Sequence, residues 1–292
     1  MKDVDAFLSG LPAEDTTPLV GDWLVEPVTR KTSLGRSVDG ASTVSLNNGL
    51  IRRAFSLAPN GATVAFDNLL TDQAILRGVS PEARVSVNGT ELDVGGLEGQ
   101  TQYGYLRREW VEQMTSAPGA LQLVGIDSGE TQAPFPWRRC RHHADLPWPA
   151  PGVRLSMRYT ASTSPVAVTV HYEMYDAVPV LVKWLEITNV SDGPVQINRF
   201  CVEVLAVVDY ESCVEGQKGW PYPTLHVESD YAFHGMTAAS ADVTTNWLPD
   251  PRYTSQVNYQ LQSPLLLETS PPLGPDVELP AAETLTSFRT FL

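Results

Sequence analysis

Short runs of β-branched and aromatic residues recur along the chain, and Gly, Pro, Asn and Asp separate them. The clearest run is Val166–Tyr175, in which apolar residues such as Val170 and Tyr172 alternate with polar residues such as His171 and Glu173. Strict alternation places one set on each face of a strand. Helical periodicity is scarce, so the sequence predicts an all-β fold of antiparallel sheets.

Two further runs, residues 180–188 and 195–200, flank a turn-rich linker at 189–194. This arrangement predicts an antiparallel pair of strands joined by a longer loop. The second strand is expected to continue to Val208, about fourteen residues, which exceeds the usual strand length. Strands of this length are typical of large curved sheets rather than of compact immunoglobulin-like domains.

The chain is expected to form one β domain over residues 41–292. Residues 1–40 alternate Pro, Asp and Thr and are predicted to wrap the surface or cover a sheet edge. No repeat, linker or shift in composition marks a boundary within the remainder.

Composition narrows the classes of partner. The chain is 42% hydrophobic and 18% charged, with a formal net charge of −14. Nucleic-acid binding and docking on anionic lipid both need clustered Lys and Arg, so neither a nucleic acid nor a membrane surface is expected as a partner. A neutral sugar or another uncharged small molecule is compatible with this charge, and the sequence does not predict the oligomeric state.

The three cysteines, Cys140, Cys201 and Cys213, have no metal-type spacing, and two of them lie in or near apolar runs where a free thiol packs as a small hydrophobe. No secretion signal and no membrane-length apolar run is found, so a reduced, cytoplasmic protein is predicted. Motifs for phosphate, zinc or serine-hydrolase chemistry are missing, and we expect neither a metal nor an organic cofactor.

Glu268 is the leading candidate for chemistry, because it directly follows the apolar residues 265–267. A carboxylate at the lip of an apolar strand is partly desolvated, which suits it to act as a general base. The alternative is a strand-end glutamate paired with an arginine.

Two other candidates lie within predicted strands. Glu203 interrupts an apolar run, and a buried acid must be either paired or functional; Arg199, on the same face, is the expected partner in a structural pair. His171 and Glu173 share one face of their strand. They could line a groove, although solvent exposure is the preferred interpretation.

Two aromatic loops could form a sugar site. The segment 137–148 contains Arg141, His142, His143 and Trp148, and arginine beside tryptophan can bind sugar hydroxyls while the ring stacks on the sugar. Residues 219–223 include Trp220 and precede His226 and Asp230, which could rim the same cleft. The alternative for the first segment is a structural loop that Trp137 and Trp148 pin to the core, and the alternative for the second is a loop that caps the sandwich.

These features resemble the galactose mutarotase-like β-supersandwich family, and the resemblance implies a large antiparallel two-sheet supersandwich for the single domain 41–292. The similarity is most specific in residues 194–205 and in Leu267-Glu268-Thr269 followed by Pro275-Asp276. The resemblance implies that Glu268 takes the proton from the anomeric hydroxyl of a hexose, so that an acid on the ring oxygen can open the ring. The expected function is therefore a carbohydrate-binding protein and possible aldose 1-epimerase.

The resemblance leaves the acid unassigned. The family's acid histidine aligns with Phe200, which cannot donate a proton, and the earlier substrate-positioning histidine could correspond to His142 or His143. Glu203, His171 or His226 could supply the acid if the fold brought one of them to Glu268.

A second likeness is to the N-terminal sandwich domain of melibiase-type α-galactosidases. It covers 49–53, 83–84, 180–184 and 259–260. Those enzymes carry their catalytic aspartates in a following barrel, and this sequence ends at Leu292 before any barrel, so we do not expect hydrolysis. The likeness implies the alternative function, a non-catalytic sugar-binding or accessory domain. A purely structural interaction module is a third hypothesis.

Overall fold

A computed structural model describes residues 3–138, 140, 146–208, 223–231, 243–256 and 258–292. Its regular structure consists almost entirely of antiparallel strands, which confirms the predicted all-β sandwich. Helices are limited to α1 (Val4–Ser9) and α2 (Arg108–Val111) within these ranges. Neither is long and apolar enough to cross a membrane.

One layer is a single sheet, called the long sheet here. Its strand order is β11-β12-β13-β14-β22-β17, and β21 also pairs with β14. The strands are β11 (Gln122–Glu130), β12 (Gly152–Thr160), β13 (Val166–Tyr175), β14 (Leu181–Asn189), β17 (Glu228–Ser229), β21 (Thr284–Thr286) and β22 (Thr290–Phe291).

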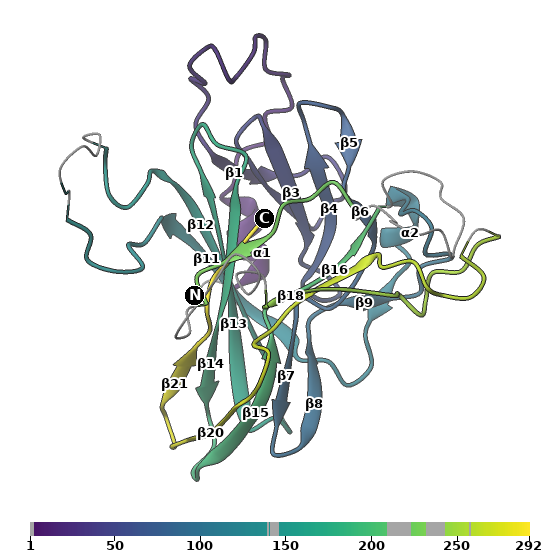
Figure 1. Cartoon of the computed structure of the whole chain (residues 1–292), viewed down its shortest axis with the longest axis vertical. Coiled ribbons are helices and arrows are strands. Elements are labelled where there is room, and N and C mark those ends of the chain that lie inside the picture. Colours follow the sequence, from purple (N-terminus) through teal and green to yellow (C-terminus); the bar gives the residue numbers. More distant parts are fainter. Residues whose placement is uncertain (1–2, 139, 141–145, 209–222, 232–242, 257) are drawn as a thin grey trace.

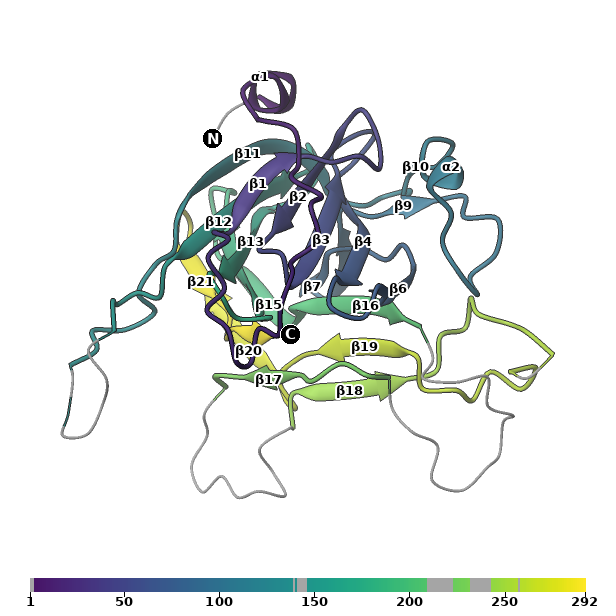
Figure 2. The ribbon, with the colours of Figure 1, turned by 90° about the horizontal axis from the view of Figure 1, so that it is seen from above.

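The facing layer is divided into three hydrogen-bonded sheets (Figures 1 and 2). The N-terminal sheet runs in order from β1 to β5: β1 (Ser33–Arg36), β2 (Thr43–Asn47), β3 (Ile51–Ser56), β4 (Ala62–Asn68) and β5 (Gln73–Ala74). The β7 sheet has the order β20-β15-β7-β8: β7 (Ala83–Val87), β8 (Thr90–Val94), β15 (Val195–Cys201) and β20 (Pro275–Leu279). The β16 sheet has the order β18-β19-β16-β6: β6 (Leu76–Gly78), β16 (Glu203–Val207), β18 (Thr245–Leu248) and β19 (Leu266–Thr269). A small ladder joins β9 (Leu97–Glu98) to β10 (Thr115–Ser116).

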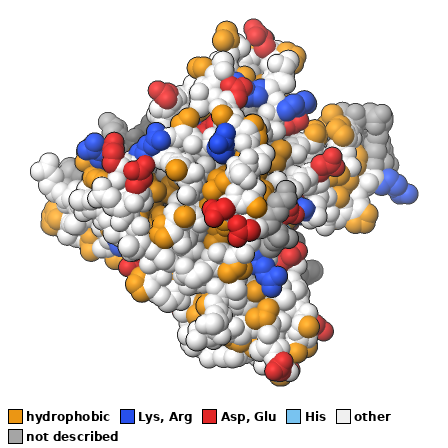
Figure 3. Space-filling view, turned by 180° about the vertical axis from the view of Figure 1, so that it is seen from behind, with side chains coloured by type: hydrophobic (Ala, Val, Ile, Leu, Met, Phe, Trp, Pro, Cys, Tyr) orange, Lys and Arg blue, Asp and Glu red, His pale blue; other side chains and the backbone are white. Residues whose placement is uncertain are grey.

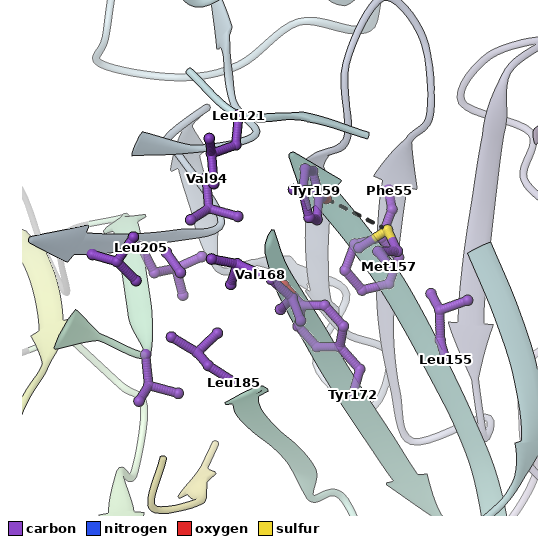
Figure 4. Close-up of a cluster of buried hydrophobic side chains, with 14 of the residues drawn as sticks. Phe55, Val94, Leu121, Leu155, Met157, Tyr159, Val168, Tyr172, Leu185 and Leu205 are labelled. Carbon is purple, nitrogen blue, oxygen red and sulfur yellow. Dashed lines mark hydrogen bonds between the residues drawn. The ribbon is translucent and has the colours of Figure 1, made fainter. Parts of the chain in front are cut away.

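The two layers share one hydrophobic core. The alternation predicted for β13 is confirmed, because Val166, Val168, Val170, Tyr172 and Met174 are all fully buried. Figure 4 shows Tyr172 beside Phe55 of β3, with ring centroids 4.7 Å apart, and Leu205 of β16 in the same cluster. The core therefore ties the long sheet to the facing sheets across the sandwich.

The N-terminal segment partly joins the facing layer. Phe7 of α1 packs into the core, and residues 33–36 form the edge strand β1. Between them, Glu14 binds Arg52 of β3, with Oε1 and Nε 2.6 Å apart.

Two predictions about strand pairing are wrong. β14 and β15 do not form a hairpin, because β14 belongs to the long sheet whereas β15 pairs with β7 and β20. The loop 190–194 is an arch between layers, and Asn189 holds its base by donating to the carbonyls of Gly193 and Leu279. The predicted long strand 195–208 is also split at Val202 into β15 and β16, which lie in different sheets.

Glu203, the first residue of β16, lies in the core at 0% exposure, and its partner is not Arg199. Its carboxylate is 2.6 Å from Arg53 Nη1 of β3 and 2.7 Å from Lys183 Nζ of β14. Burial alone would raise the pKa of Glu203, but the two cations outweigh it and lower the pKa to about 2.

Glu82 completes this buried charge cluster, which consists of Arg53, Lys183, Glu203 and Glu82. Glu82 accepts hydrogen bonds from the Thr63 backbone, at 2.5 Å, and from the Tyr172 hydroxyl, while its own carbonyl accepts from Lys183. The positive charges of two cations thus balance the negative charges of two carboxylates within the core. Lys183 comes from the long sheet, as does Tyr172, which donates to Glu82, whereas the other members of the cluster come from the facing layer. The cluster therefore fixes the two layers relative to each other.

The expectation that His171 and Glu173 face solvent is also wrong. Both side chains are buried on the outer face of the long sheet. His171 Nδ1 lies 2.8 Å from Ser156 Oγ, and its ring stacks on Trp184 with centroids 4.8 Å apart. Glu173 accepts a hydrogen bond of 2.7 Å from the backbone of Gln132.

Replacing Lys183 with Met tests the buried charge cluster. The variant removes one cation and keeps much of the side-chain volume, so the free energy of unfolding in urea is expected to fall by about 3 kcal/mol. Lys31→Met is the matched control, because Lys31 is 74% exposed and pairs with Asp176 at 3.1 Å. It should change stability by less than about 1 kcal/mol. Equal effects of the two variants would contradict a stabilising role for the cluster.

Stability should also depend on the protonation of His171. Burial lowers its pKa below the ordinary 6.5, despite the nearby Glu186. The unfolded chain therefore binds the proton more readily, and stability is lost as pH falls below 6.5. His171→Phe should flatten the change in unfolding free energy between pH 8 and 5.5. His226→Phe, at an 86% exposed position, should leave that change as it is in the wild type. A slope that His171→Phe does not alter would refute this assignment.

Candidate functional site

Glu268 lies in the middle of the β16 sheet and points away from the core. It is paired with Val204 of β16 on one side and Asn246 of β18 on the other, as the order of strands in Figure 2 makes visible. Its neighbours in sequence, Leu267 and Thr269, are fully buried, so alternation turns Glu268 to the opposite face. There it stands beside a small apolar cluster that includes Cys201 and Leu266. The side chain of Glu268 is 20% exposed.

Arg84 of β7 is the direct partner of Glu268. Its Nη1 lies 2.5 Å from Glu268 Oε1, and its Nε lies 3.1 Å from Asp93 Oδ1 on β8. Burial alone would lower the pKa of Arg84, but these carboxylates outweigh it and raise the pKa above its usual value. The arginine therefore joins the β7 sheet to the β16 sheet.

Two hollows meet at the Arg84–Glu268 pair, and together they are called the Glu268 groove. The small hollow has a volume of about 240 Å³ and is also lined by Ser86, Phe200 and Ser270. The large hollow has a volume of about 420 Å³ and is also lined by Asp93, Ala117 and Arg252. The large hollow alone falls within the range of small-molecule sites.

A buried ion pair supports the wall of the large hollow. Asp250 Oδ2 is 2.8 Å from Arg77 Nη2, and both side chains are almost fully buried. Arg252 bonds to Asp250 Oδ1 at 3.2 Å and to the Val79 carbonyl at 2.9 Å. Burial alone would raise the pKa of Asp250, but Arg252 and Arg77 lower it, so the carboxylate stays ionised and holds residues 249–252 in place.

Cys201 lies at the base of the small hollow as a buried free thiol. Its Sγ donates to the Glu203 carbonyl at 3.0 Å. Burial, with a smaller contribution from the Glu268 carboxylate, raises the pKa of this thiol to about 12. Cys201 therefore stays protonated at neutral pH and does not act as a nucleophile.

The other described candidates do not meet at this groove. Glu203 is on β16 but faces the core, and its bonds to Arg53 and Lys183 hold it there. His171 is on the outer face of the long sheet, and neither it nor Glu203 lines either hollow. The fold thus does not bring either residue into the lining of the Glu268 groove.

The aromatic-loop residues are also separate from Glu268. Trp148 is 40% exposed and packs on Phe135 and Trp137 in the loop between β11 and β12. This loop projects from the sandwich well away from β16 and β18 in both ribbon views (Figures 1 and 2). Trp148 therefore packs against residues of its own loop.

Near the end of the chain, His226 pairs with Glu228 at 3.1 Å, and Asp230 accepts a 2.6 Å hydrogen bond from the Arg289 backbone. Neither residue lines the described hollows. Arg141, His142, His143 and Trp220 lie outside the described residues.

No role for Arg84, Asp93 or Arg252 was predicted from the sequence. One signal was present: Arg84 occupies a polar position in the alternating strand 83–87, and Glu91 and Asp93 alternate in the strand that follows. Such a pattern predicts cross-strand ion pairs. It does not predict Glu268, because β7 and β19 lie in different sheets.

Charges of both signs are interspersed on the face shown in Figure 3, among polar and hydrophobic side chains. Among the described residues, no group of three or more His, Cys, Asp or Glu side chains could hold a metal ion. The Glu268 groove is thus one place in the described part of the chain where polar groups converge on a hollow.

The raised pKa and burial of Cys201 predict that it resists alkylation. At pH 8 about one molecule in ten thousand would carry the thiolate at this position. Cys140 is exposed, and iodoacetamide should label it in the native protein, whereas Cys201 should react only after unfolding. Peptide mass spectrometry would measure both rates. Labelling of Cys201 as fast as Cys140 would show that the thiol is accessible and ionised.

Comparisons with known proteins give little further constraint. No family model and no curated protein sequence matches the chain. Among solved structures, the chain is similar to the galactosidase domain of alpha-galactosidase-sucrose kinase, AgaSK, with a TM-score of 0.46 and 9% sequence identity. The match covers 89% of this chain and 41% of that chain, so this chain spans about two fifths of the length of the matched protein.

Proposed function

We propose that the Glu268 groove binds a neutral carbohydrate without converting it. The observation that carries the proposal is the Arg84–Glu268 pair, which stands partly exposed where the two hollows meet. A sugar hydroxyl can donate to the carboxylate and accept from the guanidinium at the same time. Hydrogen bonds to charged groups are the stronger kind, so the pair is a suitable anchor for a polyhydroxylated ligand.

The charges around the groove favour an uncharged ligand. In the small hollow, Arg84 and Arg199 are balanced by Glu91 and Glu268. In the large hollow, four carboxylates outnumber two arginines. An anionic ligand would meet this excess of carboxylates, whereas a neutral sugar can use donors and acceptors of both kinds.

The groove favours binding over turnover. Ring opening needs both a base at the anomeric hydroxyl and an acid at the ring oxygen. Arg84 occupies Oε1 of Glu268, and no histidine lines either hollow among the described residues. Cys201, with its pKa of about 12, is a poor acid at neutral pH.

Aldose 1-epimerase activity is the second candidate, and one observation favours it. Phe200 and Glu268 line the same small hollow, and these are the positions that the mutarotase resemblance assigns to the acid and the base. In addition, Oε2 of Glu268 accepts no hydrogen bond within the described part of the chain and could accept a proton. A catalytic acid would still have to come from elsewhere.

Calorimetry with galactose and glucose tests the proposal. The wild type should bind a sugar, and Glu268→Gln should weaken binding about tenfold, because it removes the charge from one hydrogen-bond partner. Glu109→Gln is the matched control, since Glu109 also pairs with an arginine, at 3.3 Å, but lies outside the groove lining. Its affinity should match that of the wild type.

Polarimetry of freshly dissolved α-galactose and α-glucose separates the two candidates. Under the proposed binding function, the wild type and Glu268→Gln both leave the interconversion of anomers at its spontaneous rate. Acceleration by the wild type and not by the variant would establish the epimerase instead. Failure of a wider panel of sugars to bind at millimolar concentration would reject the carbohydrate function.

A further inference from the structure

We propose that the Glu268 groove takes an oligosaccharide that crosses the Arg84–Glu268 pair, with one sugar unit in each hollow. This inference rests on the proposed carbohydrate function and specifies the ligand further. It assigns the small hollow to a terminal unit and the large hollow to the unit linked to it.

The shared lining of the two hollows carries the inference. Arg84 and Glu268 line both of them, and none of their other lining residues is common to the two. The pair is therefore the boundary between two adjacent volumes. A single ring on one side of the pair leaves the other volume unfilled, whereas a linked pair of rings passes over the boundary and uses both.

The pair can bind two consecutive units. Arg84 presents Nη1 to Glu268 and Nε to Asp93, so its guanidinium extends from the Glu268 carboxylate toward the large hollow, which Asp93 also lines. Glu268 has its second oxygen, Oε2, in addition to the one that Arg84 binds. Hydroxyls from both sides of a glycosidic linkage can therefore meet charged partners at this boundary.

The two hollows differ in chemistry in a way that suits different units. The small hollow offers the apolar side chain of Phe200, which packs on Phe288 with centroids 5.9 Å apart, together with the hydroxyls of Ser86 and Ser270. An apolar side chain with nearby hydroxyls matches the two-sided character of one sugar ring. The large hollow carries the charged side chains of Asp93, Glu98 and Arg252 beside apolar residues such as Leu248 and Leu266, which suits a ligand with many hydroxyls.

Ion pairs within the protein already fix the side chains that line the groove. Asp93 fixes Arg84, and the buried Arg77–Asp250 pair fixes the segment that carries Arg252. A site whose side chains are already ordered loses less entropy on binding. Each added sugar unit should therefore increase the affinity, because its binding free energy is not offset by the cost of ordering the wall.

A length series of sugars tests the inference by calorimetry. The probes are galactose, galactobiose and galactotriose, with glucose, maltose and maltotriose as a second series. In at least one series, the disaccharide or trisaccharide should bind the wild type at least about tenfold more tightly than the monosaccharide does.

Two variants then assign the units to the hollows. Ala117→Trp fills the large hollow and should abolish the advantage of the longer sugars, while monosaccharide affinity stays within about twofold of the wild type. Ser86→Trp fills the small hollow and should weaken every member of the series. Ala281→Trp, at an exposed position outside both linings, is the control and should change nothing. Melting curves establish that each variant is folded, and if a variant unfolds, the wild-type length series decides alone.

The outcomes separate this inference from the proposed function. Equal affinity for all lengths in both series, or a length advantage that persists in folded Ala117→Trp, would overturn the two-unit groove and leave sugar binding intact. Failure of every sugar to bind would overturn both.

Discussion

The orientation of Glu203 is the constraint on which the site depends. Its carboxylate lies between Arg53 and Lys183 in a core that excludes water, so β16 must present residue 203 inward. The register between β16 and β19 then determines which way Glu268 faces. Glu203 is paired with Thr269 of β19, and the residue before Thr269 must face the other way. By fixing the orientation of β16, the buried charge cluster thus places Glu268 on the face where Arg84 lies.

This arrangement explains how two glutamates on neighbouring strands come to differ so much. Both are held by arginine, but Glu203 is closed in by two cations from opposite layers and serves the packing of the sandwich. Glu268 has one arginine on one oxygen and borders open volume on both sides. The ion-pair and ligand-binding interpretations of Glu268 are therefore compatible, because a partly exposed pair offers a donor and an acceptor side by side.

The sequence predicted well what local alternation determines. Each apolar position of β13 that was assigned to the core is buried, and the all-β sandwich is confirmed. Prediction from the sequence failed where a partner comes from a distant part of the chain. The run 180–188 pairs with β13, β21 and β22 and not with the run that follows it, and Glu203 finds Arg53 about 150 residues away and not the nearby Arg199. Arg84 was missed as a site residue for the same reason, since its partner Glu268 lies 184 residues further on and in another sheet.

The outer face of the long sheet shows a second limit of the sequence. Alternation placed His171 and Glu173 on the face opposite the core. It could not reveal that Trp184 of the neighbouring strand stacks on His171, or that Gln132 and Arg289 from connecting segments contact Glu173. A polar residue on an outward face is exposed only if nothing packs over it, and loops that cross a sheet leave no periodic signal.

A crystal structure of the protein with a bound galacto- or malto-trisaccharide would test the central claim most directly. The account predicts sugar hydroxyls within hydrogen-bond distance of both the Arg84 guanidinium and the Glu268 carboxylate, one ring in each hollow, and Glu203 still enclosed by Arg53 and Lys183. Sugar bound elsewhere on an intact sandwich, with the Arg84–Glu268 pair untouched, would contradict it.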